Sequence, residues 1–131
     1  MNQITQNIID TVQVGALASV NEDSSPLVTP LHFARFEDSI IWVSDLNAKH
    51  SQNIERTGKA EFVVWNEQKQ AVYLKTSVAK VADADIDSVR AAYSAKLGDF
   101  MPKFDNPQFY QAPIGEFDEN STTGNWRHYI A

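Results

Sequence analysis

Residues 14–36 read VGALASVNEDSSPLVTPLHFARF, and this stretch predicts the first hairpin of a β-rich fold. Val14, Ala16, Ala18 and Val20 recur at every second position, which is the period of a strand. The segment 21–26 is rich in Asn, Asp, Ser and Pro, the residues that reverse a chain. A second apolar run over 27–35 then returns beside the first.

Pro30 stands in the middle of that second run. Proline has no N–H to donate to a ladder and belongs at a sheet edge or at a bulge. Two local structures are therefore possible for residues 27–35. The sheet is interrupted at Pro30, which would free neighbouring backbone groups for another partner, or residues 27–35 form a plain edge strand.

The flanking sequence adds further elements on both sides of this hairpin. Ile4, Ile8, Ile9 and Val12 predict a short amphipathic helix over residues 3–12. Further strands are expected at 40–44, 59–66, 71–81 and 126–130, and helices at 47–56 and 86–97. The pattern is weak over 99–124 and indicates an irregular cover. The sequence thus predicts a mainly β fold with a few helices, an antiparallel β-barrel of about six strands, in a single domain over 1–131.

Composition excludes several classes of function. The chain has 17 acidic and 11 basic residues, a formal net charge of −6, and no cysteine. An acidic chain without a Lys/Arg stripe predicts no nucleic-acid partner and no membrane surface, and no stretch is long and apolar enough to span a bilayer. The three histidines lack the spacing of a metal site, so no metal is expected. The absent cysteines and the lack of a signal-like N-terminus favour a cytoplasmic location.

Lys49 and His50 form a basic pair in the first turn of the predicted helix at 47–56. Cations at a helix N-terminus oppose the macrodipole, and an anion bound there would remove the conflict. The alternative is a solvated Lys beside a structural His.

Four segments, 15–20, 26–33, 41–45 and 49–54, resemble the pyridoxamine 5'-phosphate oxidase-like superfamily in their order and spacing, most closely its small general-stress-protein members. The resemblance is strongest over 14–82. It implies a split β-barrel that forms a homodimer with FMN at the interface. The positions that match the family's FMN contacts are Thr29, Pro30, Leu31 and His32 along the ring, Val43 and Ser44 near the ribityl chain and phosphate, the phosphate pair Lys49 and His50, and Trp126 on the last strand.

The match departs from the family at three places. His50 stands where the family commonly has Lys, which predicts weaker or pH-dependent flavin binding. Thr29 stands where the pyridoxamine oxidases carry a basic phosphate ligand. Arg127 and His128 are adjacent, so they do not reproduce the Arg-x-His substrate pair. Pyridoxamine 5'-phosphate oxidation is therefore not expected.

Two classes of function remain at this stage, and a third alternative is that the site has decayed and only the dimer remains, because the phosphate contacts are weakened. The first is an FMN-dependent oxidoreductase that acts on an unidentified small molecule, in which the flavin supplies the redox chemistry. The second is a non-catalytic binding or redox-sensing stress protein, with a deazaflavin (F420) or haem as alternative cofactor. No catalytic residue can be assigned, and His32 is a candidate acid or base by position alone.

Overall fold

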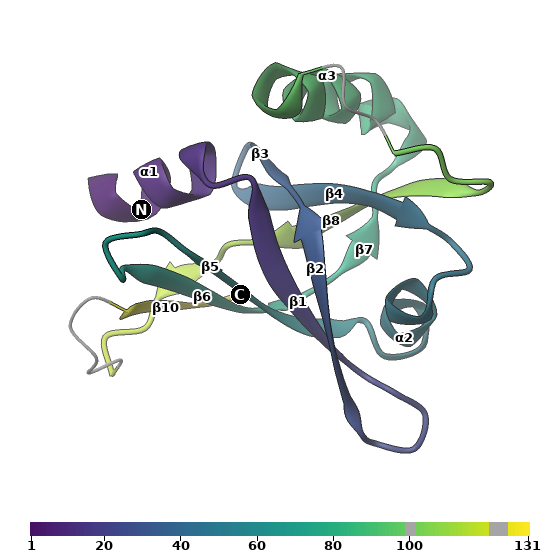
Figure 1. Ribbon diagram of the computed structural model, residues 1–131, viewed down its shortest axis with the longest axis horizontal. Helices are drawn as coiled ribbons and strands as arrows, with labels where there is room; N and C mark the ends of the chain where they lie inside the picture. The colour runs from purple at the N-terminus through teal and green to yellow at the C-terminus, as the bar shows by residue number, and fades with distance from the viewer. Residues whose placement is uncertain (99–101, 121–125) are drawn as a thin grey trace.

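The computed structural model describes residues 1–98, 102–120 and 126–131 (Figure 1). Its helices are α1 (Gln3–Thr11), α2 (Lys49–Thr57) and α3 (Ile86–Leu97), with a short 3₁₀ turn at Asp83–Asp85. Its strands are β1 (Val14–Val20), β2 (Pro26–His32), β3 (Ala34–Phe36), β4 (Ser39–Asp45), β5 (Lys59–Trp65), β6 (Ala71–Ser77), β7 (Ala79–Lys80), β8 (Pro107–Pro113), β9 (Glu116–Phe117) and β10 (Trp126–Ile130). None of the helices within these ranges is long and apolar enough to cross a membrane.

The strands form two sheets that share continuous segments of chain. Sheet A has the order β2-β1-β5-β6-β10-β9, and sheet B has the order β3-β4-β8-β7. The chain passes from sheet A to sheet B at Phe33, whose N–H donates to the Gln13 carbonyl at 3.2 Å, and again at Val78, whose N–H donates to the Gly58 carbonyl at 2.9 Å. Each of these two crossings divides a segment that the sequence predicts as a single strand, 27–35 at Phe33 and 71–81 at Val78. The result is a split barrel.

The predicted barrel is confirmed, with two corrections to its strands. β10 runs parallel to β6, with Arg127 opposite Val72, so sheet A is mixed and not purely antiparallel. The segment expected to be irregular contains β8, which pairs with β4 over seven residues from Pro107 to Pro113. The strand pattern is hard to see in the sequence for two reasons. Pro107 and Pro113 stand at the two ends of β8, and Gln108 and Gln111 lie among its aromatic residues.

Pro30 does not interrupt its strand. β2 pairs with β1 continuously from Pro26 to His32, with Pro30 opposite Ala16, and lies at the edge of sheet A. The edge position is the one that a proline tolerates, because its nitrogen can face away from the ladder.

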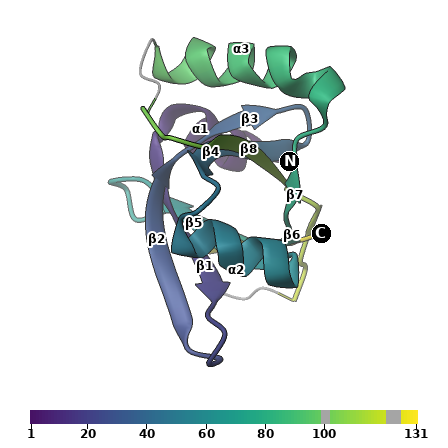
Figure 2. The ribbon, with the colours of Figure 1, turned by 90° about the vertical axis from the view of Figure 1, so that its right-hand side faces the viewer.

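Two apolar clusters hold the layers together. The larger one fills the barrel between the sheets and includes Leu17, Phe33, Trp42 and Phe62, with Ile8 and Ile9 of α1 packed at one end. The smaller one lies on the other face of sheet B, under α3. Figure 2 shows α3 lying across β3 and β4, outside the barrel, and Figure 1 shows α2 at the end of the barrel opposite α1. β4 contributes to both clusters because successive side chains point to opposite faces of a sheet.

Gly15 is required where β1 crosses the aromatic core. A Cβ placed on Gly15 would lie 2.2 Å from the tip of the Phe62 ring. That ring is fully buried and packs edge-on against Phe33, with 5.0 Å between centroids, so it has no room to move aside. The glycine therefore sets how closely β1 approaches the core.

We expect Gly15→Ala to lower the free energy of unfolding by about 1–3 kcal/mol, because it overpacks the core. Urea denaturation monitored by tryptophan fluorescence measures the change. In a Phe62→Leu background the same substitution should cost clearly less, since the clashing ring atoms are gone. Equal costs in both backgrounds would show that the contact with Phe62 is not the cause.

Candidate functional site

A cavity of about 160 Å³ lies where β2, β4, α2 and α3 meet. Six of the residues that the sequence marks as cofactor contacts line this cavity, together with three that it does not mark. The predicted residues are Pro30, Leu31 and His32 on β2, Val43 and Ser44 on β4, and His50 on α2; the additional ones are Tyr93, Pro102 and Phe104. Segments far apart in the sequence thus converge on one cavity.

His50 points into the cavity and pairs with Ser44. Its Nε2 lies 2.8 Å from the Ser44 Oγ, in a hydrogen bond whose direction depends on the imidazole tautomer. Burial lowers the pKa of His50 below its ordinary value of 6.5, because desolvation disfavours the charged ring. At neutral pH the pair is therefore an uncharged imidazole and a hydroxyl, which can both donate and accept hydrogen bonds.

Lys49 lies outside this cavity. Its side chain lines a separate polar hollow of about 390 Å³ between α2 and the β1–β2 turn, together with Asp23 and Arg56. The positive charge of Lys49 helps to lower the pKa of Asp23, after the larger effect of the hydrogen bonds from Ser25. The two members of the predicted basic pair consequently face different spaces, as adjacent residues on a helix do.

α2 is fixed on two sides, which fixes the direction of His50. The buried Asn53 amide donates to the Asn21 Oδ1 at 2.9 Å and to the Ser19 Oγ at 3.2 Å, which ties the helix to the first hairpin. On the other side the Tyr110 hydroxyl donates to the Glu55 carboxylate at 3.2 Å. The C-terminus of α2 stops at Gly58, which adopts the left-handed conformation (φ 67°) that favours glycine.

α3 is held over the cavity by Lys96. The Lys96 ammonium donates to the carbonyls of Ile9 and Val12, at 2.8 and 2.6 Å, and lies 3.7 Å from the centre of the Phe33 ring. It thereby binds α3 to the end of α1 and to the segment that follows β2. One helical turn earlier, Tyr93 is buried and lines the cavity, and burial raises the pKa of its phenol, so it stays protonated.

Besides Lys49, two predicted contacts lie away from the cavity. Thr29 is opposite Leu17 in the β1–β2 ladder and is not among the lining residues. Trp126 is on β10, four strands from β2 in sheet A, with its ring 6.2 Å from that of Tyr73. It cannot contact the cavity of its own chain.

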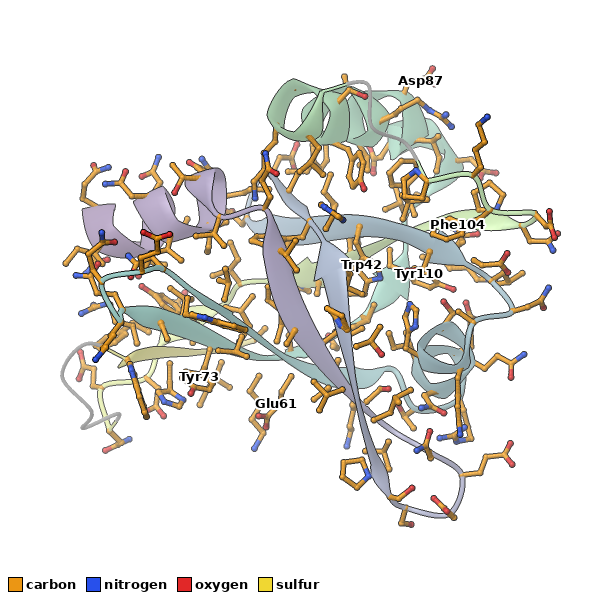
Figure 3. The ribbon with its side chains drawn as sticks, viewed as in Figure 1. Trp42, Glu61, Tyr73, Asp87, Phe104 and Tyr110 are labelled. Atoms are coloured by element: carbon orange, nitrogen blue, oxygen red, sulfur yellow. The ribbon has the colours of Figure 1, made fainter. Side chains whose placement is uncertain are left out.

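The three lining residues that were not predicted have only a weak signal in the sequence. Tyr93 belongs to the apolar stripe of the predicted helix at 86–97, which is typical of core packing and gives no indication of a site. Pro102 and Phe104 lie in the segment without a clear pattern. Figure 3 places Phe104 near one end of β8, across the barrel from Glu61 and Tyr73.

The sequence profile described as "Pyridoxamine 5'-phosphate oxidase" matches residues 1–117. The chain belongs to the pyridoxamine 5'-phosphate oxidase-like split-barrel superfamily. A comparison with the sequences of curated proteins gives no match.

Solved structures of this split-barrel type are similar in fold at low sequence identity. A haem-binding protein from Mycobacterium smegmatis superposes with a TM-score of 0.74 at 12% identity, over 86% of this chain and 50% of that one, so this chain spans half its length. An F420 reductase gives a TM-score of 0.69 at 12% identity, over 86% and 94% of the two chains. An FAD-binding protein from Mesorhizobium loti superposes with a TM-score of 0.67 at 15% identity, over 84% of each chain.

The cavity fits a flavin in part. Apolar side chains and a free strand edge suit the flat ring, and the neutral Ser44–His50 pair suits a hydroxylated chain. Its volume of about 160 Å³ is below the ~300–1,000 Å³ typical of cofactor sites, so one chain does not enclose a whole flavin. A terminal phosphate does not fit, because no Lys or Arg is among the described residues that line the cavity.

The depressed pKa of His50 predicts a pH-dependent stability. Between the folded pKa and 6.5 the unfolded chain binds more protons at this position than the folded one, so the free energy of unfolding falls as the pH falls through that window. The difference between wild type and His50→Gln, measured by urea denaturation from pH 8 to pH 5, isolates this residue. Wild type should lose more stability than His50→Gln below pH 6.5; parallel curves would show that His50 is not desolvated.

Proposed function

We propose that the protein binds a flavin, FMN being the form that the family resemblance implies, at the interface of a homodimer and uses it to oxidise or reduce a small molecule. The observation that carries the proposal is the cavity between β2, β4 and α2, which gathers six residues at positions that match flavin contacts of the family. The flavin supplies the electron or hydride transfer, and the protein supplies binding, orientation and exclusion of water.

The outer face of sheet A supports the dimer. Its exposed residues include Val14, Val20, Val28, Trp65, Trp126 and Ile130. No helix covers this face in Figure 1, and Figure 3 shows Glu61 and Tyr73 projecting from it, away from the barrel. A groove of about 520 Å³ with largely apolar walls crosses the same face. An exposed apolar sheet face of this extent is typical of a protein interface.

The cavity adjoins the same face of sheet A at β2. Pro30 and His32 line the cavity, and in the β1–β2 ladder they lie opposite Ala16 and Val14 on the outer face of sheet A. A second chain on this face would extend the walls of the cavity and accommodate the part of a flavin that one chain leaves uncovered. Trp126 would then contact the flavin of the partner chain and not that of its own.

Within the cavity, three groups can hold or move a proton. These are the imidazoles of His32 and His50 and the phenol of Tyr93. His50 is neutral at pH 7 and can accept a proton, whereas the Tyr93 phenol can donate one. His32 lies on the strand that would follow the flavin ring, so it is the candidate acid or base nearest to a bound substrate.

A non-catalytic holder of a cofactor is the second candidate. It is favoured by the absence of Asp, Glu, Lys and Arg from the described lining of the cavity. The haem-binding protein among the similar structures adds haem to the cofactors to test, and the F420 reductase adds the deazaflavin. Bleaching of bound flavin by a nicotinamide donor, followed by turnover with an acceptor, separates the enzyme from the holder.

We expect the purified protein to have the mass of two chains in size-exclusion chromatography with light scattering. Val28→Glu places a charge on the exposed sheet face and should weaken the dimer by about tenfold or more, the equivalent of about 1.4 kcal/mol. Ile4→Glu on α1 is the control, because Ile4 is also exposed and apolar but lies outside that face. A monomeric wild type would contradict the dimer.

We expect the protein to retain added flavin through desalting, with visible absorption bands shifted from those of free flavin. Ser44→Leu should abolish retention, because the larger side chain fills the cavity and removes the partner of His50. Ser88→Leu, on the exposed surface of α3, should retain flavin as wild type does. A wild type that stays colourless with FMN, riboflavin and F420 would rule out flavin binding.

A further inference from the structure

The described residues that line the cavity carry no permanent charge, although the chain is strongly charged. Its described lining has two imidazoles and one phenol as titratable groups, His32 on β2, His50 on α2 and Tyr93 on α3, and no carboxylate, ammonium or guanidinium. A phosphate dianion is held by positive charge and several donors at close range. A ligand with a terminal phosphate would therefore leave most of its charge uncompensated here.

Most cations on the surrounding elements have contacts elsewhere, and Lys103, between the lining residues Pro102 and Phe104, is exposed and is not among the described lining residues. Arg35 on β3 forms a bidentate pair with Asp10 at 2.8 Å, and Lys96 on α3 caps the end of α1. Arg56 on α2 donates to the Asn53 side chain and to the Val20 carbonyl, and Lys80 on β7 pairs with Glu55 at 3.4 Å. Lys49 faces the hollow beside Asp23.

The polar groups that do face the cavity suit hydroxyls. A neutral imidazole offers one donor and one acceptor, and the Ser44 hydroxyl offers both. Their bond of 2.8 Å can open toward a ligand hydroxyl without leaving a buried charge unpaired. Val43, Leu31 and Pro30 supply apolar walls on either side.

We propose that this site selects a flavin by its ring and its hydroxylated side chain and not by a terminal phosphate, so that riboflavin binds about as tightly as FMN at and above neutral pH. The inference rests on the proposed flavin site and specifies its ligand class. It departs from the basic pair that the sequence resemblance places at Lys49 and His50.

Flavin fluorescence titrations of the purified dimer with riboflavin and with FMN, at pH 8 and pH 6, test the inference. At pH 8 the two dissociation constants should agree within about threefold, because the described lining that one chain supplies offers the phosphate no cation. A wild type that binds FMN tenfold or more tightly than riboflavin at pH 8 would overturn the inference and leave the proposed flavin site intact. Failure to bind either flavin at both pH values would overturn the proposed function, and the inference with it.

The pH 6 arm tests the role of His50. Acidification to pH 6 should improve FMN binding relative to riboflavin by about threefold or more, since a phosphate beside His50 favours the protonated imidazole and accepts a charge-assisted bond from it. The titratable groups that share the cavity are His32 and Tyr93, so His50→Gln should remove the gain if His50 carries it. A gain of the same size in His50→Gln would overturn the assignment of His50 to the ligand's tail.

Two variants test the missing charge directly. His50→Lys places a permanent cation in the cavity and should improve FMN over riboflavin by about tenfold at pH 8. Lys49→Gln is the matched control, and the ratio of the two dissociation constants should stay at its wild-type value, because Lys49 lines the other hollow. A selective tenfold loss of FMN binding in Lys49→Gln would show that this side chain reaches the phosphate and would overturn the inference. The Lys49→Gln and pH arms decide the question even where His50→Lys does not fold.

Discussion

The position of β2 at the edge of sheet A is the constraint on which the rest of the site depends. β2 pairs with β1 along its whole length and has no strand on its other side among the described residues, and Pro30 in its centre cannot donate to such a neighbour. The free edge leaves room for the cavity between β2, β4 and α2. The same strand also contributes Val28 and Pro30 to the exposed face of sheet A. β2 therefore borders both the cavity and the surface that suits a second chain.

The elements around that edge are held by a few specific contacts as well as by general apolar burial. Gly15 lets the Phe62 ring pack directly against the backbone of β1, which brings the first hairpin close to the core. Lys96 ties α3 to the end of α1 beside Phe33, and Asn53 ties α2 to the first hairpin. Each of these contacts joins residues distant in the sequence, and together they fix the directions of Tyr93 and His50.

The electrostatics of the cavity differ from those of the chain as a whole. The protein carries a formal net charge of −6, yet the described lining of the cavity has neither acidic nor permanently basic side chains. Burying an unpaired charge is costly, and Arg35 and Lys96 are already paired, the first with the Asp10 carboxylate and the second with backbone carbonyls at the end of α1. A neutral, partly apolar pocket with an imidazole–hydroxyl pair is what remains, and it favours the ring and hydroxyl groups of a cofactor over an anionic tail.

The sequence by itself determined the local elements and the family. The alternation over 14–20, the stripe of Ile4, Ile8 and Ile9, and the glycine stop at Gly58 are local signals, because strand and helix periods are written in consecutive residues. Only the tertiary structure decided that β10 runs parallel to β6, that β8 completes sheet B, and that Tyr93 joins the cavity. It also decided that Lys49 and His50, neighbours in sequence, face different spaces. The direction of a side chain is set by the contacts that hold its helix, here those of Asn53 and Glu55, and such long-range contacts leave no periodic signal in the chain.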